Sequence, residues 1–399
     1  MYSPFKRARS KTKKRMRRAT ASAFTNLLTA MLLPAAPTKG TASKRKKPAP
    51  KTARRTTKPT PKSGTWDEKS SPRSRVNSTA KPPARARTAL KKPVGASFTK
   101  GVHSSEFGTR TFKLYIPSRA GLSAGLSEAP LPLVVMLHGC SQTPDDFARG
   151  TRMNLLAEEF GFFVVYPAQD RKSQLYRCWN WYKRSDQGRG EGEPALLANL
   201  VREIVLKQKV DPARVYVAGL SAGASVALIV ADAYPDIFAA VGAHSGLPVG
   251  AAHDEATAVV AMQFGAPGRP HSHPLPTISF QGGSDKVVNP RNGRFIVARA
   301  LEPYPQLHKT VKSGHITDGR DYVRTSHRLG TGRSLIEEWV VVGGAHAWSG
   351  GNAADSYTDA TGPDASREMV RFFLRHRTTM KRRSTQPEIR EVSTSLRGA

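Results

Sequence analysis

Three residues, in the order serine, aspartate and histidine, have the chemistry needed for nucleophilic catalysis. Ser221 lies in the sequence Gly-Leu-Ser-Ala-Gly, Asp285 follows 64 residues later, and His346 follows 61 residues after that. A serine hydroxyl becomes a strong nucleophile when an imidazole accepts its proton, and a carboxylate fixes the tautomer of that imidazole. The three residues therefore predict acyl transfer such as ester hydrolysis. The alternative is that Asp285 caps a turn and His346 is a structural loop residue.

Each of these three residues closely follows an apolar segment that predicts a β-strand. The segments are residues 214–219, 277–282 and 338–344. The serine also opens a predicted helix at residues 222–234, so its hydroxyl should stand at a sharp strand-to-helix turn, which small flanking residues permit. Because the carboxyl ends of parallel strands meet at one edge of a sheet, we expect the three side chains to lie close together.

Ester hydrolysis also needs two backbone amides that donate hydrogen bonds to the developing oxyanion. One should come from Ala222, the residue after the nucleophile. The other should come from Cys140, in the turn after an early predicted strand at residues 131–139. We expect His138 to support this turn as a structural residue rather than to act as a base.

The apolar pattern predicts the fold that positions these groups. Continuous apolar runs, typical of strands buried on both faces, alternate with segments that carry apolar residues at spacings of three and four. This alternation predicts an α/β protein with a doubly wound, mostly parallel sheet and helices on both faces. The predicted strands are residues 110–117, 131–139, 162–167, 214–219, 239–246, 277–282 and 338–344, and the predicted helices are residues 146–160, 194–209, 222–234, 291–301 and 364–376.

The chain has 399 residues and a formal net charge of +33, and this charge is unevenly distributed. Residues 1–100 hold 28 basic and 2 acidic residues, whereas residues 101–376 hold 29 and 26. We therefore expect a disordered polybasic tail and linker at residues 1–100, a catalytic domain at residues 101–376 and a disordered tail at residues 377–399. Two cysteines, no Gly-X-Y period and no apolar run of about eighteen residues exclude a disulfide-stapled miniprotein, a collagen and a polytopic membrane protein.

The basic tail leaves the location and partners of the protein open. Residues 24–36 are mildly apolar and follow a basic stretch, which outlines a secretory signal; a short amphipathic anchor helix or a misassigned start also fits them. A signal would place the protein outside the cell or in its envelope, whereas without one a cytoplasmic location fits. Residues 1–62 would attract nucleic acid, polyphosphate or anionic lipid nonspecifically, and no specific nucleic-acid motif accompanies them.

Five motifs together resemble the PHB (polyhydroxybutyrate) depolymerase family of esterases, over about residues 105–376. They are His138-Gly139-Cys140-Ser141-Gln142, Cys178-Trp179-Asn180-Trp181, Gly219-Leu220-Ser221-Ala222-Gly223, Asp285 with Val288, and His346-Ala347-Trp348-Ser349-Gly350-Gly351. The resemblance implies an α/β-hydrolase fold, hydrolysis of hydroxyalkanoate ester bonds, and the catalytic roles assigned above. One departure is Gln281, where a histidine is expected before the acid turn.

Other motif residues predict the surroundings of the site. From their positions alone, Cys140 and Cys178 form either a disulfide or two buried thiols; the resemblance implies the disulfide, which favours an oxidising compartment. The resemblance also places aromatic residues beside the substrate. The residues expected to contact substrate are Trp179, Trp181, Trp348 and Gln142, although the tryptophans would also fit a hydrophobic core.

We therefore expect a serine carboxylesterase that uses no metal ion and no organic cofactor. His271 and His273 come closest to a metal-binding motif. However, no carboxylate or cysteine lies at ligand spacing beside them in the sequence. The expected substrates are 3-hydroxybutyrate oligomers, other poly(3-hydroxyalkanoate) fragments and soluble esters. The alternatives are a feruloyl or acetyl(xylan) esterase of the same fold, and a polyanion-binding protein whose hydrolase domain is secondary.

Overall fold

The computed structural model describes residues 93–118 and 129–378 of the chain. The predictions for the basic residues 1–62, for the signal-like residues 24–36 and for residues 379–399 lie outside the described residues. Within the described ranges, no helix is both long enough and apolar enough to cross a lipid bilayer. The first described strand begins at Ser97, slightly before the predicted domain start at residue 101.

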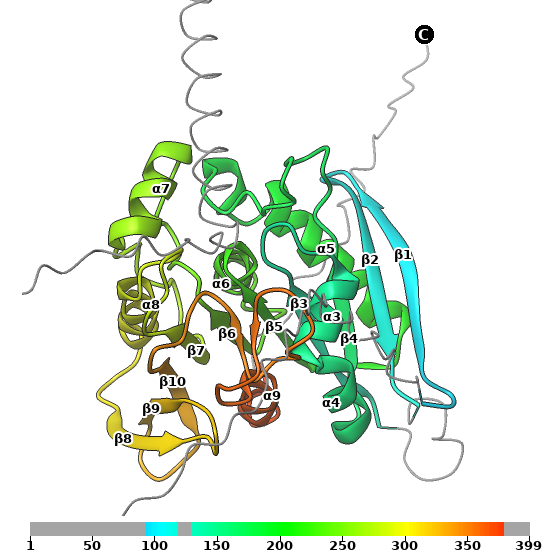
Figure 1. Cartoon of the computed structure of the whole chain (residues 1–399). Coiled ribbons are helices and arrows are strands. Elements are labelled where there is room, and N and C mark those ends of the chain that lie inside the picture. Colours follow the sequence, from blue (N-terminus) through cyan, green and yellow to red (C-terminus); the bar gives the residue numbers. More distant parts are fainter. Residues whose placement is uncertain (1–92, 119–128, 379–399) are drawn as a thin grey trace, which may run out of the picture. The chain divides into compact units, whose positions relative to one another are not determined.

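A mostly parallel β-sheet organises the described residues (Figure 1). Its strand order is β1-β2-β4-β3-β5-β6-β7-β10-β9-β8. Strands β4, β3, β5, β6, β7 and β10 pair in parallel, and antiparallel strands extend the sheet on both sides. The strands are β1 (Ser97–Ser105), β2 (Gly108–Ile116), β3 (Leu131–Leu137), β4 (Phe163–Pro167), β5 (Val210–Leu220), β6 (Ala240–His244), β7 (Thr277–Gly282), β8 (His308–His315), β9 (Asp321–Arg328) and β10 (Ser334–Val341), with a small separate pair β11 (Trp348–Ser349) and β12 (Thr358–Asp359).

Helices cover both faces of this sheet and bury two separate hydrophobic clusters against it. One face packs against α5 (Gly192–Lys207), α6 (Ala222–Ala233), α7 (Glu255–Phe264) and α8 (Arg291–Leu301). The other packs against α3 (Pro144–Thr151), α4 (Met153–Phe160) and α9 (Ala365–Phe373), and a short 3-10 helix, η1, spans Arg184–Asp186. This is the layered α/β architecture that the alternating apolar segments predicted.

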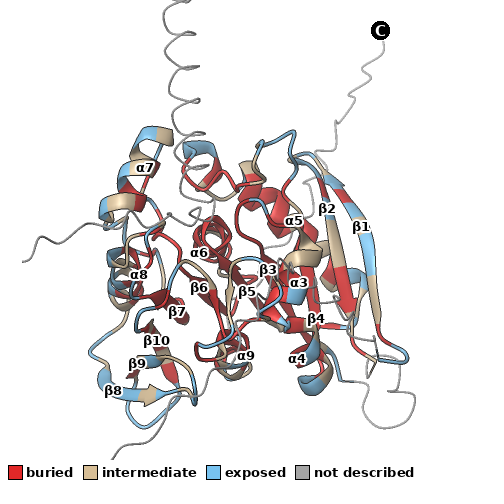
Figure 2. Cartoon of the chain, in the orientation of Figure 1, coloured by how far each residue is buried: buried red, intermediate tan, exposed pale blue. Residues whose placement is uncertain are grey.

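The continuous apolar sequence of β3 follows from this double coverage. Leu133, Val135 and Leu137 belong to the cluster on the α5–α6 face, whereas Val134 and Met136 belong to the cluster on the α3–α4–α9 face. A strand buried on both faces has no polar face to present, so its residues do not alternate between polar and apolar. Figure 2 shows the same burial through most of α6, which lies between the sheet and other helices.

The predicted helix at residues 146–160 is instead two helices that divide at Arg152. This residue has a left-handed backbone, with φ of 56°. The carbonyl oxygen of Thr151 accepts a hydrogen bond at 2.6 Å from the hydroxyl of Ser366, in α9. This tertiary contact uses a carbonyl group that an unbroken helix would bond internally, and sequence spacing alone does not reveal it.

A buried carboxylate on α6 anchors the loop that leads into β7. Oδ1 of Asp232 lies 3.0 Å from Nδ1 of His271, and Oδ2 accepts a hydrogen bond from Arg269 at 2.7 Å. Burial alone would raise the pKa of Asp232, but the hydrogen bond and charge of His271 and the charge of Arg269 lower it to about 2. His271, considered above for metal binding, thus has a structural carboxylate partner.

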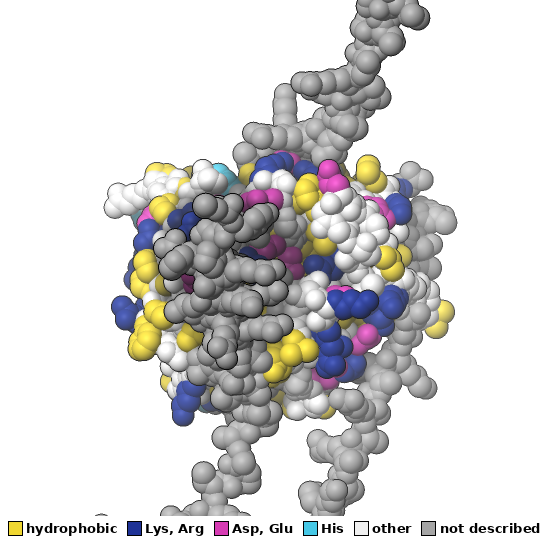
Figure 3. Space-filling model, turned by 90° about the horizontal axis from the view of Figure 1, so that it is seen from above, with side chains coloured by type: hydrophobic (Ala, Val, Ile, Leu, Met, Phe, Trp, Pro, Cys, Tyr) yellow, Lys and Arg dark blue, Asp and Glu magenta, His cyan; other side chains and the backbone are white. Residues whose placement is uncertain are grey.

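The surface of the described domain mixes charges of both signs. In the view of Figure 3, dark blue Lys and Arg side chains and magenta Asp and Glu side chains lie next to one another on the part of the surface that is coloured. This interspersion agrees with the nearly equal basic and acidic counts of residues 101–376.

Candidate active site

Ser221 occupies the turn between β5 and α6 with a strained backbone. Its φ is 57° and its ψ is −122°, a region that residues other than glycine rarely adopt. Its amide donates to the carbonyl oxygen of His244 at 2.9 Å, which ties the turn to the neighbouring strand β6. A Cβ atom at Gly223 would overlap the carbonyl oxygens of Leu137 and His138. The glycine is therefore required by the close approach of the turn to the end of β3.

Asp285 and His346 come together at the ends of two neighbouring parallel strands, β7 and β10. Oδ2 of Asp285 lies 2.8 Å from Nδ1 of His346, and both side chains are buried. Oδ1 of Asp285 accepts from the amides of Val287 and Val288, each at 2.9 Å. Burial alone would raise the pKa of Asp285, but His346, through its charge and its hydrogen bond, and the two amides lower it below its ordinary value. The carboxylate is thus held ionised and aimed at the imidazole.

Gln281, the departure from the family pattern, contacts the same carboxylate. Its Nε2 donates to Oδ2 of Asp285 at 3.1 Å from the end of β7. Gln281 is only 2% exposed, so solvent does not compete for this bond. The amide therefore supports the acid from a position where the family pattern has a histidine.

Ser221 and His346 line the same small pocket, together with Gly139, Leu220 and Tyr357. Within residues 93–118 and 129–378, no hydrogen bond joins the Ser221 hydroxyl to the His346 ring. Catalytic hydrogen bonds are commonly long without substrate and tighten in the reacting complex. The structure thus brings the predicted nucleophile and base to one cavity, with the Asp285 carboxylate on the far nitrogen of the imidazole.

The backbone amides of Cys140 and Ala222 are available to bind an anion beside Ser221. In the part of the chain that the structure describes, neither amide donates to a protein acceptor. Both residues line a second pocket that Ser221 also lines. Ala222 begins α6, so the positive end of the helix dipole points to the same place. This arrangement can stabilise a developing oxyanion.

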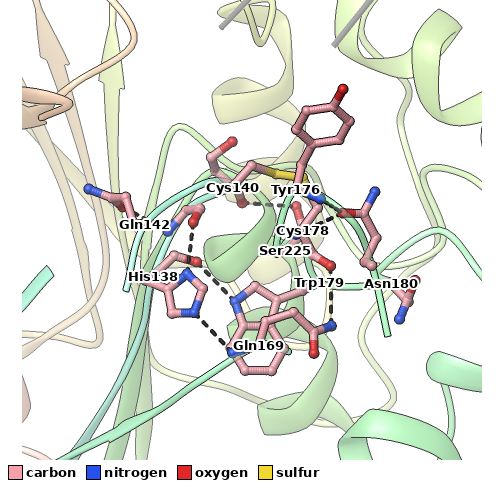
Figure 4. Close-up of a disulfide and its surroundings, with 12 residues drawn as sticks. His138, Cys140, Gln142, Gln169, Tyr176, Cys178, Trp179, Asn180 and Ser225 are labelled. Carbon is pink, nitrogen blue, oxygen red and sulfur yellow. Dashed lines mark hydrogen bonds between the residues drawn. A yellow bond between two sulfur atoms is a disulfide. The ribbon is translucent and has the colours of Figure 1, made fainter. Parts of the chain in front are cut away.

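Cys140 and Cys178 form a disulfide that joins the turn after β3 to the loop after β4 (Figure 4). The pairing that the resemblance implied is therefore present, and the alternative of two buried thiols is wrong. The amide of Ser141 also donates to the carbonyl oxygen of Tyr176 at 2.6 Å, beside the disulfide. A covalent bond and a hydrogen bond thus hold the candidate oxyanion turn against the same loop.

The three tryptophans expected to contact substrate occupy different places. Trp181 lines the pocket beside Ser221. Trp179 and Trp348 are 0% and 1% exposed, and their indole N–H groups donate to the carbonyl of His138 and to the hydroxyl of Ser366. This differs from the expectation, because both rings lie behind the pocket walls with internal partners and have no surface left for substrate.

Gln142 lines the pocket, but both ends of its side-chain amide form hydrogen bonds within the protein. Its Oε1 accepts from the amide of Gly139 at 2.9 Å, and its Nε2 donates to the carbonyl oxygen of Ser356 at 3.2 Å. Its side-chain amide thus braces the turn that carries Cys140. Tyr357, which sequence reasoning missed, lines the same pocket from the loop between β11 and β12.

Apolar side chains from four separate segments complete the second pocket. Sequence reasoning named Trp181 and Val288 here and missed the others. The missed residues come from separate segments and belong to no recognised motif. Their sequence spacing does not distinguish them from residues of the hydrophobic core. They are Tyr182, Leu247, Met262 and Val287.

Two other histidines near the site are structural. Burial lowers the pKa of His138 to about 4, and burial with the charge of His346 lowers that of His244 to about 3. Nε2 of His138 accepts from the amide of Gln169, and Nε2 of His244 accepts from the amide of Ser349. Both rings are neutral and already bonded. Among the described residues, no group of three His, Cys, Asp or Glu side chains is arranged to hold a metal ion.

Comparison with known proteins finds a depolymerase family model and two depolymerases that are similar to this chain. The family described as Esterase PHB depolymerase matches residues 111–280. Poly(3-hydroxyalkanoate) depolymerase C of Paucimonas lemoignei is 30% identical over 261 residues, which cover 61% of this chain and 60% of that protein. Poly(3-hydroxybutyrate) depolymerase of Ralstonia pickettii is 27% identical over 304 residues, 70% of this chain and 60% of that protein. The chain thus spans about 60% of the length of both depolymerases.

Esterases of another kind are also similar. Acetylxylan esterase A of Emericella nidulans is 32% identical over 146 residues, which cover 36% of this chain and 45% of that protein. The solved structure of an acetyl xylan esterase from Aspergillus awamori superimposes with a TM-score of 0.50 at 17% identity, covering 70% of this chain and 98% of that one. This likeness and the sheet described above show an α/β-hydrolase fold. Residues 111–280 of this chain thus match the PHB depolymerase family of esterases.

Proposed function

We propose that the chain is a serine esterase that acts through an acyl-enzyme on Ser221. The main observation behind this proposal is that the strained Ser221 turn shares a pocket with His346. On the other side of that imidazole, Oδ2 of Asp285 lies 2.8 Å from Nδ1. Three residues from three strand ends rarely converge in this way without a catalytic role. The catalytic domain in this proposal is residues 101–376.

In the proposed mechanism, the Ser221 oxygen attacks the ester carbonyl carbon as its proton passes to Nε2 of His346. Asp285 keeps the other proton on Nδ1 and stabilises the imidazolium. The amides of Cys140 and Ala222 donate to the oxyanion, and His346 then returns its proton to the leaving alcohol. A water molecule next attacks the acyl-enzyme by the same route, which releases the acid and restores the Ser221 hydroxyl.

For the substrate, we propose ester bonds of poly(3-hydroxyalkanoates) and of 3-hydroxybutyrate oligomers. Two relatives that match most of the domain are depolymerases of such polyesters. The pocket beside Ser221 is walled by Trp181, Leu247, Met262 and Val287, and these apolar side chains suit a short aliphatic acyl group. Of the residues expected to contact substrate, Trp181 and Gln142 are on the pocket walls, and Trp181 is the one we retain as a substrate contact.

A second candidate is an acetyl(xylan) or feruloyl esterase, because relatives with those names share the fold and part of the sequence. The same catalytic groups would serve this reaction, and only the outer cleft would differ. The relatives are named as esterases and depolymerases, so they give no support to the polyanion-binding hypothesis.

We also propose that the protein works outside the cell or in the cell envelope. The disulfide supports this proposal, since disulfides persist in oxidising compartments. Detection of the mature protein in culture fluid or periplasm, with Cys140 and Cys178 resistant to thiol alkylation, would support it. Recovery from the cytoplasm alone would contradict it.

The proposed function can be tested with one purified protein and two assays. Turnover is measured on 3-hydroxybutyrate oligomers of graded length, acetylated xylan and feruloyl esters, and a fluorophosphonate probe reports the nucleophile. Ser221→Ala should abolish both turnover and labelling, whereas Ser173→Ala, at an exposed serine, should leave both unchanged. Labelling that survives Ser221→Ala would disprove the nucleophile, and faster turnover of xylan or feruloyl esters would favour the second candidate.

A further inference from the structure

The carboxylate of Glu193 is enclosed behind the turn that carries Cys140. Glu193 lies in the first turn of α5 and is 7% exposed. Its Oε1 accepts from Nε2 of Gln169, from Nδ2 of Asn180 at 3.2 Å and from Arg110 at 3.3 Å. Its Oε2 accepts from the backbone amide of Asn180 at 2.9 Å. Every hydrogen-bond partner of this carboxylate donates, so the Glu193 side chain acts only as an acceptor.

Gln169 connects this carboxylate to the turn by two routes, and Figure 4 shows Gln169 beside His138 and Cys178. Its backbone amide donates to Nε2 of His138 at 3.1 Å, and its side-chain amide donates to the carbonyl oxygen of Cys178 at 3.1 Å. Nδ1 of His138 in turn donates to the carbonyl oxygen of Gly139 at 2.8 Å. Cys178 is covalently bonded to Cys140. The first route ends at the peptide unit whose amide would bind the oxyanion, and the second ends at the side chain of Cys140, which carries that amide.

Asn180 and Trp179 supply a third route. Because Glu193 fixes the amide of Asn180, it also fixes the preceding indole, whose Nε1 donates to the carbonyl oxygen of His138 at 2.9 Å. Arg110, itself paired with Glu193, lies over the Trp179 ring at 5.3 Å from its centre. The loop after β4 and the turn after β3 are therefore held to one buried anion.

Glu193 does not itself reach the reacting atoms. In the described part of the chain, neither Glu193 nor Gln169 lines the two pockets that contain Ser221. The pKa of Glu193 is raised above its ordinary value, first by burial and also by the charge of Asp186, although Arg110 and the amide donors oppose this shift. A neutral glutamine of the same shape would turn an NH2 group toward other donors, because an amide accepts on one side only. The network thus needs a carboxylate in particular.

We propose that Glu193 is a positioning residue for the oxyanion hole, which fixes the Cys140 amide through Gln169, His138 and Cys178. This inference rests on the proposed esterase function. Its consequence is that the loss of one buried charge, outside the pocket, weakens transition-state binding more than substrate binding. Misplacement of a catalytic donor by about 1 Å costs about 100-fold in rate.

The test compares Glu193→Gln with Glu337→Gln in the full-length protein. Glu337 is 0% exposed and accepts hydrogen bonds from Arg324 and Arg371, so its variant matches the loss of a buried carboxylate at a position that lines neither pocket. Each variant is assayed with p-nitrophenyl butyrate for kcat and KM, with phenylboronic acid for inhibition, and by thermal unfolding. Fluorophosphonate labelling gives the concentration of intact sites, and kcat is calculated on that concentration.

Glu193→Gln should lower kcat about 100-fold with KM within about twofold of wild type, and it should weaken boronate inhibition by a similar factor. Glu337→Gln should lower the melting temperature and leave kcat and boronate inhibition near wild type. A Glu193→Gln variant that loses stability yet keeps wild-type kcat would overturn the inference. Inactive, unlabelled wild-type protein would instead overturn the proposed function.

If Glu193→Gln does not fold, Gln169→Met is the second variant that tests the same network. It removes the side-chain bonds to Glu193 and to Cys178 and keeps the backbone bond to His138. The same inference predicts a fall of about tenfold or more in kcat with KM nearly unchanged. A folded Gln169→Met enzyme with wild-type kcat and wild-type boronate inhibition would refute the role of this network.

Discussion

Nδ1 of His346 lies 2.8 Å from Oδ2 of Asp285, although 61 residues separate them in sequence. The contact exists because β7 and β10 are parallel neighbours, so that both loops leave the sheet at the same edge. Asp285 thereby presents one oxygen to the imidazole and the other to two backbone amides.

Asp285→Asn should abolish most activity while leaving the fold intact. An asparagine side chain cannot hold the proton on Nδ1 of His346, so the imidazole is left in the wrong tautomer, a defect that costs about 10⁴-fold in kcat in serine hydrolases. The measurement is kcat on a soluble butyrate ester, with circular dichroism as the control for folding. A fall of less than about tenfold would show that another residue is the acid.

Asp232→Asn should lower stability in a pH-dependent way. The pKa of Asp232 is lowered from 3.8 to about 2, so its ionised form stabilises the fold at higher pH by about 2 kcal/mol. A lowered folded-state pKa gives stability that is complete above pH 3.8 and is lost as pH falls through about 2.

Urea unfolding of wild type and Asp232→Asn at pH 5 and pH 3 measures this effect. The difference in unfolding free energy between the two proteins should be about half as large at pH 3 as at pH 5. A difference that stays constant or grows at pH 3 would contradict the assignment. Asp254→Asn, at an exposed helix cap with its own hydrogen bonds, provides a comparison on a different helix.

Replacement of both Cys140 and Cys178 by alanine should lower stability and activity together. The disulfide closes a loop with a sequence separation of 38, and such a bond stabilises a fold by about 4 kcal/mol in the chain-entropy treatment. It also holds the turn that carries the candidate oxyanion donor. Thermal unfolding and kcat should both fall, and reduction of wild type by a phosphine should reproduce the loss. Wild-type kcat in the reduced protein would disprove a catalytic contribution.

Gly223→Ala should destabilise the fold by about 3 kcal/mol and remove activity. The added Cβ would overlap the carbonyl oxygens of Leu137 and His138, which are backbone atoms at the end of a buried strand. Gly188→Ala is the matched control, because its Cβ would meet only the end of the Glu191 side chain at 3.0 Å. Equal melting temperatures for the two variants would refute the steric explanation.

Met262→Ala should widen the pocket beside Ser221 and change the preference among acyl chains. Met262 lines that pocket from α7, whereas Val260 on the same helix is 56% exposed and serves as the control position. The ratio of kcat/KM for hexanoate and acetate esters should rise about tenfold in Met262→Ala and stay constant in Val260→Ala. An unchanged ratio would place the acyl group elsewhere.

The sequence predicted the parallel centre of the fold, and the three catalytic candidates closely follow strands that the structure contains. Strand β3 is a continuous apolar run that glycine closely follows, and β7 is a short segment that ends in glycine; these features are local. By contrast, β8 is almost wholly exposed and has no apolar alternation, so its pairing with β9 was not predicted. Where one predicted helix divides at Arg152, the carbonyl oxygen of Thr151 accepts a hydrogen bond from Ser366, a residue more than 200 positions away.

The walls of the site were less predictable than its catalytic groups. Trp179 and Trp181 are two residues apart in one motif, yet one is wholly internal and the other faces the pocket. The difference arises because the Trp179 indole has an acceptor, the carbonyl of His138, inside the fold. Glu193 was likewise missed, since a glutamate in the first turn of a helix is ordinary and only the packing shows that it is buried.

The position of β8 affects how a second copy of the chain could approach the sheet. Among the described strands it forms one end of the sheet, where unpaired backbone groups would accept a strand from another molecule. Lys309 and Lys312 stand on this exposed strand, and two like charges would face one another if two such edges met. Charge repulsion between these lysines therefore opposes edge-to-edge pairing of two such sheets.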